Sequence, residues 1–292
     1  MQAKTEGNSA VSLRGRWLSV SRSDIWRSDA RDLETMKAVI LAGGFGTRLS
    51  EETELRPKPL IEIGGYPILW HIMKIFEAAG LTEFVVCGGY KAFMIKRYFA
   101  NYYLDGNDIE IDLASGSVRY LGSPRRENWK VIVADTGLDT MTGGRLKRAA
   151  ALLGHGTFCL TYGDGVADLD MRKVIEFHRS HGRLATVTAV LAPGRFGILD
   201  IASDERVSRF HEKPELNNGW ISGGFFVLEP RVIDYIDGDD TMWERQPLER
   251  LARDGELVAY RHAGFWRPMD TLRDKRELDL LWNSAAPPWK LW

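Results

Sequence analysis

The sequence predicts an α/β fold, with a mixed, mainly parallel central sheet and helices on both of its faces. From Met36 onward, short apolar runs alternate with amphipathic stretches, which is typical of strands joined by helices. The first run, residues 38–41, is apolar at every position, as strands buried on both faces are. The later segments contain more strand than helix, so we expect them to extend the sheet or to cover one end of it.

The expected elements can be placed in chain order. Residues 67–79 show one apolar helical face, with Pro67 suited to the first turn and Gly80 to the end. Asp170 stands where it would cap a helix over residues 171–181. Further helices are expected over residues 92–102 and 143–153. Strands are expected at 38–41, 84–87, 109–113, 118–121, 131–134, 158–160, 185–191, 197–201, 207–210, 221–228 and 257–260, the third and fourth of which form a hairpin.

Residues 1–35 differ from the rest of the chain. They mix Ser, Arg and Asp without sustained apolar periodicity. Their arginines are typical of a transit peptide, but their acidic residues argue against one. We therefore expect residues 1–35 to be a flexible or non-native N-terminal extension, and residues 36–292 to form a single domain.

Composition narrows the classes of partner. The 39 basic and 40 acidic residues give a formal net charge of −1, whereas a surface that binds nucleic acid is usually basic. No apolar run approaches the ~18 residues of a membrane span, and the N-terminus lacks the apolar stretch of a signal peptide. Cys87 and Cys159 each lie in an apolar run, so we expect buried thiols rather than a disulfide or a zinc site. These features predict a cytoplasmic protein without nucleic acid or membrane partners.

The strongest functional signal is a glycine-rich loop directly after the first expected strand. Its glycines let the backbone approach a phosphate closely, and Arg48 adds a planar cation that suits phosphate oxygens. A P-loop is excluded because its Gly-Lys-Ser/Thr is absent, and Leu49 stands where a dinucleotide fingerprint has its third glycine. A tight turn without a ligand is the alternative. The candidate phosphate-binding residues are Leu41, Ala42, Gly43, Gly44, Phe45, Gly46, Thr47 and Arg48.

Lys58 lies between two prolines, ten residues beyond Arg48. Pro57 and Pro59 fix the backbone and keep the segment out of an α-helix. A lysine held on a rigid loop beside a phosphate site can neutralise a pyrophosphate, although a solvated lysine in a proline-rich turn is the commoner outcome. Lys58 and Arg48 are the candidate catalytic residues.

Taken together, the segments GGFGTR and PKP resemble the sugar nucleotidyltransferases, the nucleoside-diphosphate-sugar pyrophosphorylases. Longer segments resemble the members of that family that use CTP and glucose 1-phosphate, and this likeness runs from Met36 to Trp292. They are EIGGYPILWHIMK, ANYYLDGNDIEID, DTGLDTMTGGRLKR, TYGDGVAD, FHEKPE, GWISGGFFVLEP and FWRPMDTLRDKRELDLLW.

The resemblance implies a Rossmann-like sheet and the formation of CDP-glucose and pyrophosphate from CTP and α-D-glucose 1-phosphate. It also implies Mg²⁺ as the cofactor, a homo-oligomer, and a product that feeds cell-surface polysaccharide. UTP or dTTP in place of CTP, or a nucleotide-sugar sensor without turnover, are the alternatives.

Two carboxylates are candidate ligands for that cation. Asp164 follows a buried strand, between Gly163 and Gly165, and ligands of open α/β sheets bind outside the carboxyl ends of the strands. Asp270 lies just before an expected helix over residues 271–282, where the local sequence favours an N-cap. The resemblance implies instead that Asp164 and Asp270 together hold Mg²⁺, which prefers one or two carboxylates with phosphate oxygens and water.

The sugar has its own candidate residues in the C-terminal half. The resemblance implies that Glu212 accepts hydrogen bonds from the hexose and that Lys213 pairs with its phosphate. A solvated charged loop is the alternative for both. Gly223 interrupts an expected strand, which often marks close approach to a ligand.

The base is harder to assign. Residues 139–145 depart from the Gln-Pro-Gly-Leu-like segment of the relatives that use dTTP or UTP. We expect the glycines of this segment to allow close approach to the base, and Thr142 and Arg145 to contact the nucleotide together with Gly163. The alternative for Arg145 is a place on a solvated helix face.

Overall fold

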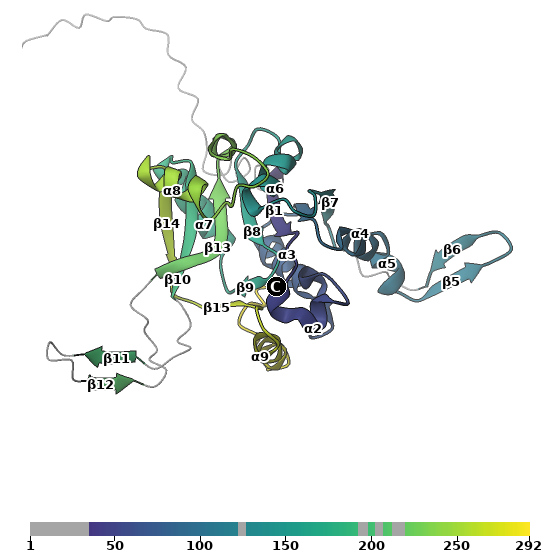
Figure 1. Cartoon of the computed structure of the whole chain (residues 1–292). Coiled ribbons are helices and arrows are strands. Elements are labelled where there is room, and N and C mark those ends of the chain that lie inside the picture. Colours follow the sequence, from purple (N-terminus) through teal and green to yellow (C-terminus); the bar gives the residue numbers. More distant parts are fainter. Residues whose placement is uncertain (1–34, 122–126, 192–197, 202–206, 212–219) are drawn as a thin grey trace, which may run out of the picture.

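A seven-stranded sheet forms the centre of the computed structural model (Figure 1), which describes residues 35–121, 127–191, 198–201, 207–211 and 220–292. Neighbouring strands are parallel, except that β13 is antiparallel to both of its neighbours. The predicted mixed, mainly parallel sheet is therefore confirmed. In spatial order the strands are β14 (Leu257–His262), β10 (Ala185–Leu191), β13 (Trp220–Leu228), β8 (Phe158–Tyr162), β1 (Lys37–Ala42), β4 (Glu83–Gly88) and β7 (Lys130–Asp135).

One end of this sheet gathers the loops that can reach a ligand. β1, β4, β7 and β8 all finish there because they are parallel. β13 runs the other way, so its first residues lie at the same end. Ligands of open α/β sheets bind outside the carboxyl ends of the strands. The topology therefore places the loops after β1 and β8 and the start of β13 around one region.

Helices cover both faces of the sheet, as predicted. Residues of β1 alternate between two buried clusters, with Ala38 and Ile40 in one and Val39 and Leu41 in the other. Helices complete the two clusters, so β1 is buried on both faces, as its apolar sequence indicates. The first cluster includes residues of α3 (Ile68–Ala78), α7 (Met171–His181) and α9 (Leu272–Trp282), and the second includes residues of α6 (Thr142–Ala149) and α8 (Gln246–Arg253).

The sequence signals at two helices are confirmed. Pro67 directly precedes α3, and Gly80 follows it with a φ of 93°, a conformation that glycine adopts without strain. The Asp170 side chain accepts a hydrogen bond from the backbone N–H of Arg172 and caps α7.

Two other helices end earlier than expected. The helix expected over residues 92–102 stops before Asn101, whose ψ of 6° leaves the regular helix, and the chain continues as two helices, α4 (Ala92–Ala100) and α5 (Tyr102–Asp105). The helix expected over residues 143–153 is α6, which passes into a 3-10 turn, η3 (Ala150–Leu152).

Short strand pairs lie outside the main sheet. β5 (Ile109–Asp112) and β6 (Ser117–Tyr120) form the expected hairpin, which projects from the body of the molecule beyond α5 (Figure 1). β11 (Ile198–Ile201) pairs with β12 (Val207–His211), and β2 (Glu62–Ile63) pairs with β3 (Tyr66–Pro67).

The strand pairing that matters most for the site is that of β9 (Gly165–Ala167) with β15 (Trp266–Pro268). The sequence does not predict this pairing. The two strands are antiparallel, with Gly165 opposite Pro268. The residue before β9 and the residues after β15 therefore meet, and the backbone N–H of Met269 donates to the carbonyl of Asp164 at 2.7 Å. This pairing brings Asp164 and Asp270 to one place.

Two expectations from composition can be compared with the structure. Cys87 and Cys159 are buried free thiols, as expected, and burial raises the pKa of Cys87 to about 12. Among the residues that the structure describes, no helix is both long and apolar enough to span a membrane.

Candidate active site

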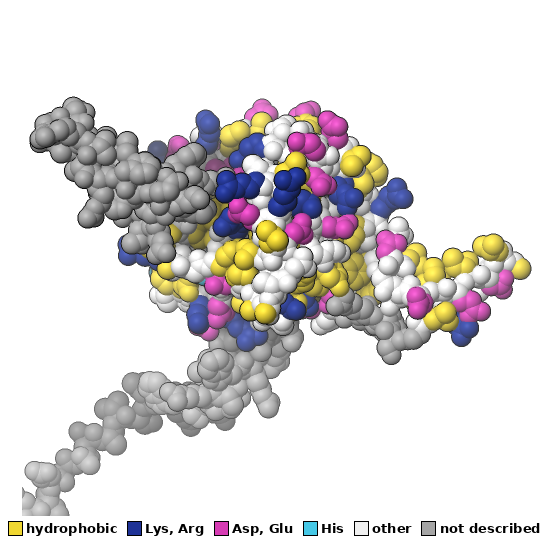
Figure 2. Space-filling view, turned by 90° about the horizontal axis from the view of Figure 1, so that it is seen from below, with side chains coloured by type: hydrophobic (Ala, Val, Ile, Leu, Met, Phe, Trp, Pro, Cys, Tyr) yellow, Lys and Arg dark blue, Asp and Glu magenta, His cyan; other side chains and the backbone are white. Residues whose placement is uncertain are grey.

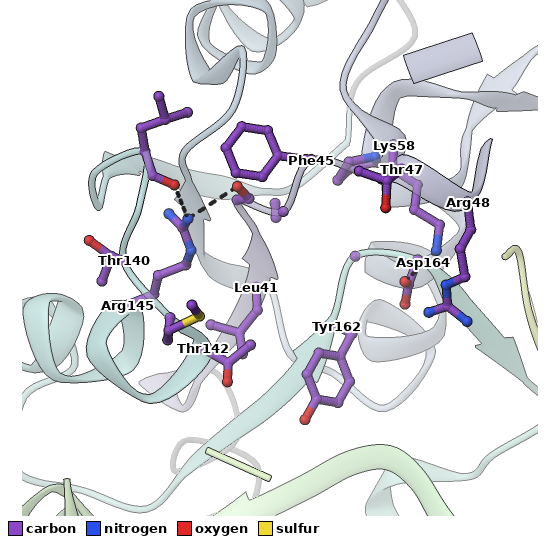
Figure 3. A pocket seen from close by; sticks show the side chains of 18 of the residues that line it. Leu41, Phe45, Thr47, Arg48, Lys58, Thr140, Thr142, Arg145, Tyr162 and Asp164 are labelled. Atoms are coloured by element: carbon purple, nitrogen blue, oxygen red, sulfur yellow. Dashed lines mark hydrogen bonds and ion pairs between the residues drawn. The ribbon is translucent and has the colours of Figure 1, made fainter. Parts of the chain in front are cut away.

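A cavity of about 470 Å³ opens at the carboxyl end of the parallel strands (Figure 3). Its walls come from the loop after β1, the segment before α6 and the loop after β8, and Lys58 and Asp270 join from elsewhere in the chain. Residues predicted from separate motifs thus surround one space. The lining residues are Leu41, Ala42, Gly43, Gly44, Phe45, Gly46, Thr47, Arg48, Lys58, Pro59, Leu138, Asp139, Thr140, Met141, Thr142, Arg145, Tyr162, Gly163, Asp164 and Asp270.

The three glycines of the loop after β1 have different surroundings. Gly46 has a φ of 67°, and a Cβ there would lie 2.6 Å from the Thr53 side chain, so only glycine fits without strain. A Cβ on Gly43 would lie 2.2 Å from the Arg145 guanidinium. A Cβ on Gly44 would have no atom within 4 Å. Gly44 therefore faces open space, and a phosphate can approach the backbone there.

Arg145 is buried, with only 4% of its surface exposed. Its Nη1 donates to Thr136 Oγ1 at 2.9 Å and to the Gly137 carbonyl at 2.6 Å, and its Nη2 donates to the Gly43 carbonyl at 3.1 Å. Further bonds go to the carbonyls of Gly88 and Leu138. The guanidinium thus ties together the loops after β1, β4 and β7. The alternative of a solvated helix face is wrong, and direct contact between Arg145 and a nucleotide stays a prediction.

The glycines at the start of α6 pack against another part of the chain. A Cβ on Gly143 would lie 2.7 Å from the carbonyl oxygen of Thr241, and one on Gly144 would lie 2.5 Å from that of Asp239. The expectation that these glycines allow close approach to a base is corrected, since what approaches them is the backbone of residues 239–241.

Lys58 joins the two predicted metal ligands. Its Nζ lies 2.7 Å from Asp164 Oδ2 and 2.8 Å from Asp270 Oδ1. Arg48 Nη1 donates to the other oxygen of Asp270 at 2.8 Å. The Lys58 side chain is 12% exposed and that of Arg48 is 73% exposed. The Lys58 contacts are therefore shielded from water, whereas Arg48 reaches Asp270 from solvent.

The two prolines beside Lys58 act as the sequence predicts. Pro57 has extended backbone, with φ of −65° and ψ of 147°, and the chain then turns in a 3-10 segment, η2 (Lys58–Leu60), rather than an α-helix. This turn places Lys58 beside the loop after β1. The closeness shows at Gly46, where a Cβ would lie 3.4 Å from the Cβ of Lys58.

The alternative that Asp270 caps α9 is wrong. The N-cap is Thr271, whose hydroxyl accepts from the backbone N–H of Asp274, and the Asp274 side chain accepts from the backbone N–H of Thr271 in return. The Asp270 carboxylate instead receives Lys58 and Arg48. A cap one residue later thus leaves Asp270 to face the cavity.

The charge of Lys58 is secured by its partners. Burial lowers the pKa of Lys58, but the charges and hydrogen bonds of Asp164 and Asp270 outweigh burial, and the pKa is raised above its ordinary value. Lys58 is therefore an ammonium ion at neutral pH.

The two carboxylates suit a divalent cation that also binds phosphate. Asp164 Oδ2 and Asp270 Oδ1 both reach one nitrogen, so both can reach one ion. Within the described part of the chain, no group of three or more His, Cys, Asp and Glu side chains could hold a metal. Mg²⁺ commonly binds one or two carboxylates and completes its shell with phosphate oxygens and water. The donor set therefore fits a cation whose remaining ligands come from a phosphorylated substrate.

A nucleotidyl transferase family model matches residues 37–252, which include the glycine-rich loop, Lys58 and Asp164. The chain belongs to the nucleotidyl transferase family. It is 55% identical to the glucose-1-phosphate cytidylyltransferase of Salmonella typhimurium over 258 residues, which cover 88% of this chain and 100% of that relative. It is 47% identical to the probable glucose-1-phosphate cytidylyltransferase of Bacillus subtilis, over 258 residues with the same coverage.

The fold of this nucleotidyl transferase is also found among solved structures. The crystal structure of a putative glucose-1-phosphate thymidylyltransferase from Bacillus anthracis superposes with a TM-score of 0.62, covering 86% of this chain and 96% of that chain. The two sequences are 18% identical, so the likeness concerns the fold alone. It agrees with the Rossmann-like sheet expected from the sequence.

The roles of the three predicted sugar-site residues of the nucleotidyl transferase stay predictions. Glu212 and Lys213 lie outside the described residues. Gly223 belongs to β13, where its carbonyl accepts from Trp266 Nε1 at 2.7 Å and a Cβ would lie 2.7 Å from Val190. Packing within the sheet accounts for this glycine, and its contact with a sugar stays a prediction.

Sequence motifs do not single out Tyr162 or Glu244. Tyr162 lines the cavity and its hydroxyl donates to Glu244. Its place directly before Gly163 and Asp164, at the end of a strand, is a signal that could have identified it. Glu244 lies in no recognisable motif, and only the folded chain brings it to Tyr162.

Proposed function

We propose that the chain joins CTP to α-D-glucose 1-phosphate and forms CDP-glucose and pyrophosphate. The observation that carries this proposal is the 55% identity to the glucose-1-phosphate cytidylyltransferase of Salmonella typhimurium, over the whole of that protein. The cavity supports it, because a loop suited to phosphate, two cationic side chains and two carboxylates line one space.

The reaction needs no covalent enzyme intermediate. An oxygen of the sugar phosphate, already ionised at neutral pH, attacks the α-phosphorus of CTP, and a new P–O bond forms between the two substrates. The bond between the α-phosphorus and the oxygen that bridges to the β-phosphorus breaks, and pyrophosphate leaves with that electron pair. Two anions must approach each other, so catalysis consists of positioning and charge neutralisation.

The chain's own groups divide these tasks. The backbone around Gly44 faces open space and can accept the phosphates closely. Arg48 is exposed and can turn from Asp270 to phosphate oxygens, with a planar fork that matches them. Lys58, charged and shielded, neutralises the departing pyrophosphate and the crowded α-phosphate.

Asp164 and Asp270 are the proposed Mg²⁺ ligands. When bound, the ion neutralises phosphate charge and orients the two substrates. Asp164 precedes β9 and Asp270 follows β15, at the same end of this antiparallel pair, so their separation is set by backbone hydrogen bonds. Such a rigid pair holds its geometry before the substrates arrive.

Recognition of the sugar and the base completes the proposal. Glu212 is assigned to the hexose hydroxyls and Lys213 to the sugar phosphate, by their resemblance to the family. Gly223 lies at the start of β13, at the same end of the sheet as the cavity. Thr142, Arg145 and Gly163 are assigned to the nucleotide side, where all three line the cavity.

Turnover with different triphosphates tests the function. The purified chain is incubated with Mg²⁺, glucose 1-phosphate and one of CTP, UTP or dTTP. Pyrophosphate release is measured, and the nucleotide sugar is identified by mass spectrometry. We expect turnover with CTP to exceed the others at least about tenfold, the scale of one good polar contact. Faster turnover with UTP or dTTP would assign a different nucleotide. Binding of CTP without pyrophosphate from any triphosphate would indicate a sensor.

We also propose a homo-oligomer in the cytoplasm. Apolar side chains lie exposed along the β5–β6 hairpin (Figure 2), among them Leu113 at 91% and Ile111 at 52%. Exposed apolar patches of this kind mark association surfaces. Sedimentation of the parent and of Leu113→Asp checks this, since a smaller particle is expected for the variant and a monomeric parent would contradict the proposal.

A further inference from the structure

Glu244 connects two walls of the cavity. Its Oε2 accepts a hydrogen bond from Thr142 Oγ1 at 2.6 Å, and its Oε1 accepts one from the hydroxyl of Tyr162. Thr142 begins α6 on the wall that carries Arg145, and Tyr162 ends β8 on the wall that carries Asp164. In Figure 3 the hydroxyls of Thr142 and Tyr162 lie between these two groups of residues. One carboxylate thus holds the two walls together.

The segment that carries Glu244 is firmly anchored. Its neighbour Trp243 is fully buried and packs against Phe226, with ring centroids 5.9 Å apart. The backbone N–H of Trp243 also donates to Thr142 Oγ1 at 2.9 Å. Upstream, the carbonyl of Thr241 accepts from the backbone N–H of Gly143 at 2.9 Å. Because this backbone is fixed, Glu244 transmits its position to the side chains that it binds.

Tyr162 is held on its other side as well. Its ring lies over Gly224, where a Cβ would be 2.7 Å from Tyr162 Cδ2, so a larger residue at Gly224 would displace the ring. With its proton given to Glu244, the phenol oxygen can only accept from a ligand. The next residues along the chain are Gly163 and Asp164.

We propose that Glu244 is a positioning residue of the transfer reaction, which sets the spacing between the wall that carries Arg145 and the wall that carries Asp164 by binding the hydroxyls of Thr142 and Tyr162. Glu244 does not line the cavity itself, so it acts through these two side chains. The inference rests on the proposed function, because spacing between walls matters only when two substrates must meet.

A spacing role predicts a particular kinetic pattern. Alignment of two bound reactants contributes to the rate of the chemical step, whereas a single bound substrate can adjust to a small change in the spacing of the walls. Loss of Glu244 should therefore lower kcat and leave the affinity for CTP alone nearly unchanged. A merely structural role would change the melting temperature and both kinetic constants together.

The test uses the full chain and four variants: Glu244→Ala, Glu244→Gln, Tyr162→Phe, and Tyr162→Phe combined with Glu244→Ala. The control is Glu249→Ala, an exposed glutamate on α8 outside the cavity. We expect Glu244→Ala to lower kcat about tenfold with the dissociation constant of CTP within about twofold of the parent. Glu244→Gln should restore most of kcat, because an amide can accept from one hydroxyl and donate to the other.

The double variant shows whether Glu244 acts through Tyr162. In the Tyr162→Phe background, Glu244→Ala should lower kcat by a clearly smaller factor than in the parent, because one of the two bonds is already lost. An undiminished factor, a parent-like kcat in Glu244→Ala, or an equal loss of CTP affinity would overturn the proposal. If Glu244→Ala does not fold, the test uses Glu244→Gln, the control and a further variant, Tyr162→Phe combined with Glu244→Gln. A kcat in Glu244→Gln as low as in this double variant would count against the proposal.

The parent separates this failure from that of the proposed function. If the parent releases pyrophosphate and the variants behave like the control, the role of Glu244 alone is refuted. If the parent releases none with any triphosphate, the proposed function and this inference fail together.

Discussion

Lys58 and Asp270 are 212 positions apart in the chain, yet Lys58 Nζ lies 2.8 Å from Asp270 Oδ1. The contact connects the 3-10 turn η2 to the segment between β15 and α9. Asp164 joins the same nitrogen from the middle of the chain, at 2.7 Å. Three distant segments therefore meet on one ammonium group at the wall of the cavity.

Removal of the ammonium group should abolish most of the activity. Lys58→Ala removes the shielded cation that neutralises the departing pyrophosphate. Loss of one such preorganised contact raises the activation barrier by on the order of 3–4 kcal/mol. We expect turnover to fall at least about a hundredfold while the circular dichroism spectrum stays that of the parent. Lys173→Ala on α7, whose side chain is 69% exposed, is the matched control. Turnover within a few-fold of the parent would discredit the role of Lys58.

Loss of one proposed metal ligand should raise the Mg²⁺ requirement. Asp270→Asn keeps the size of the side chain and one of its two acceptor oxygens, but it is a much weaker ligand for a hard cation. We expect the Mg²⁺ concentration for half-maximal turnover to rise at least about tenfold. Asp234→Asn, an exposed residue outside the cavity, serves as the control. An unchanged Mg²⁺ requirement would remove Asp270 from the metal site.

Arg145 and Arg148 lie on the same helix but should respond differently to the same change. Lysine at 145 has too few donors, in the wrong geometry, for the five acceptors that Arg145 satisfies, so Arg145→Lys should lower the free energy of unfolding by about 2–3 kcal/mol. Arg148 pairs with Asp239 at the surface, and Arg148→Lys should cost at most about 0.5 kcal/mol. Denaturant titration compares them. Equal losses would show that burial of Arg145 is not what stabilises the loops.

His71 should make stability depend on pH. Its Nε2 donates to the Ile63 carbonyl at 2.9 Å and its Nδ1 accepts from Trp289 Nε1 at 3.3 Å, which requires a neutral ring. Burial lowers the pKa of His71 from 6.5 to about 4. Between these values the unfolded chain binds more protons, so stability rises with pH. The contribution of neutral His71 to the free energy of unfolding is complete above pH 6.5. It is lost as the pH falls toward 4, and the whole loss is about 3 kcal/mol.

Unfolding free energies at pH 7 and pH 4.5 measure this contribution. In His71→Gln the amide can still donate to the Ile63 carbonyl but does not titrate. The fall in stability between the two pH values should be smaller in this variant than in the parent by about 2–3 kcal/mol. Parallel pH profiles for the two proteins would mean that His71 is not held neutral.

Local sequence accounts for the parts of the site that lie within one segment. The loop after β1, the turn at Lys58 and the cap of α7 follow from glycine, proline and aspartate at defined positions, and the structure has them as expected. Buried strands such as β1 are also predictable, because burial on both faces leaves residues 38–42 all apolar. The boundary between residues 35 and 36 stays a prediction, since residues 1–34 lie outside the described part.

Contacts between distant segments escape such reasoning. The role of Asp270 depends on the pairing of β9 with β15, two strands of three residues each whose sequences carry no clear strand signal. Arg145 looks like a surface residue at the start of a helix until the loops after β1, β4 and β7 close around it. Glycines near a pocket suggest ligand approach, but at Gly143 and Gly144 the space is taken by the chain itself.

Crystals grown with CTP and Mn²⁺, with the metal located by anomalous scattering, show whether the loop after β1, Lys58 and the two carboxylates contact one triphosphate. We predict one anomalous peak about 2.1–2.2 Å from oxygens of both Asp164 and Asp270 and of a CTP phosphate, with Lys58 Nζ turned from the carboxylates to phosphate oxygens. A metal held by the triphosphate alone, with Lys58 still bridging Asp164 and Asp270, would contradict the proposed site.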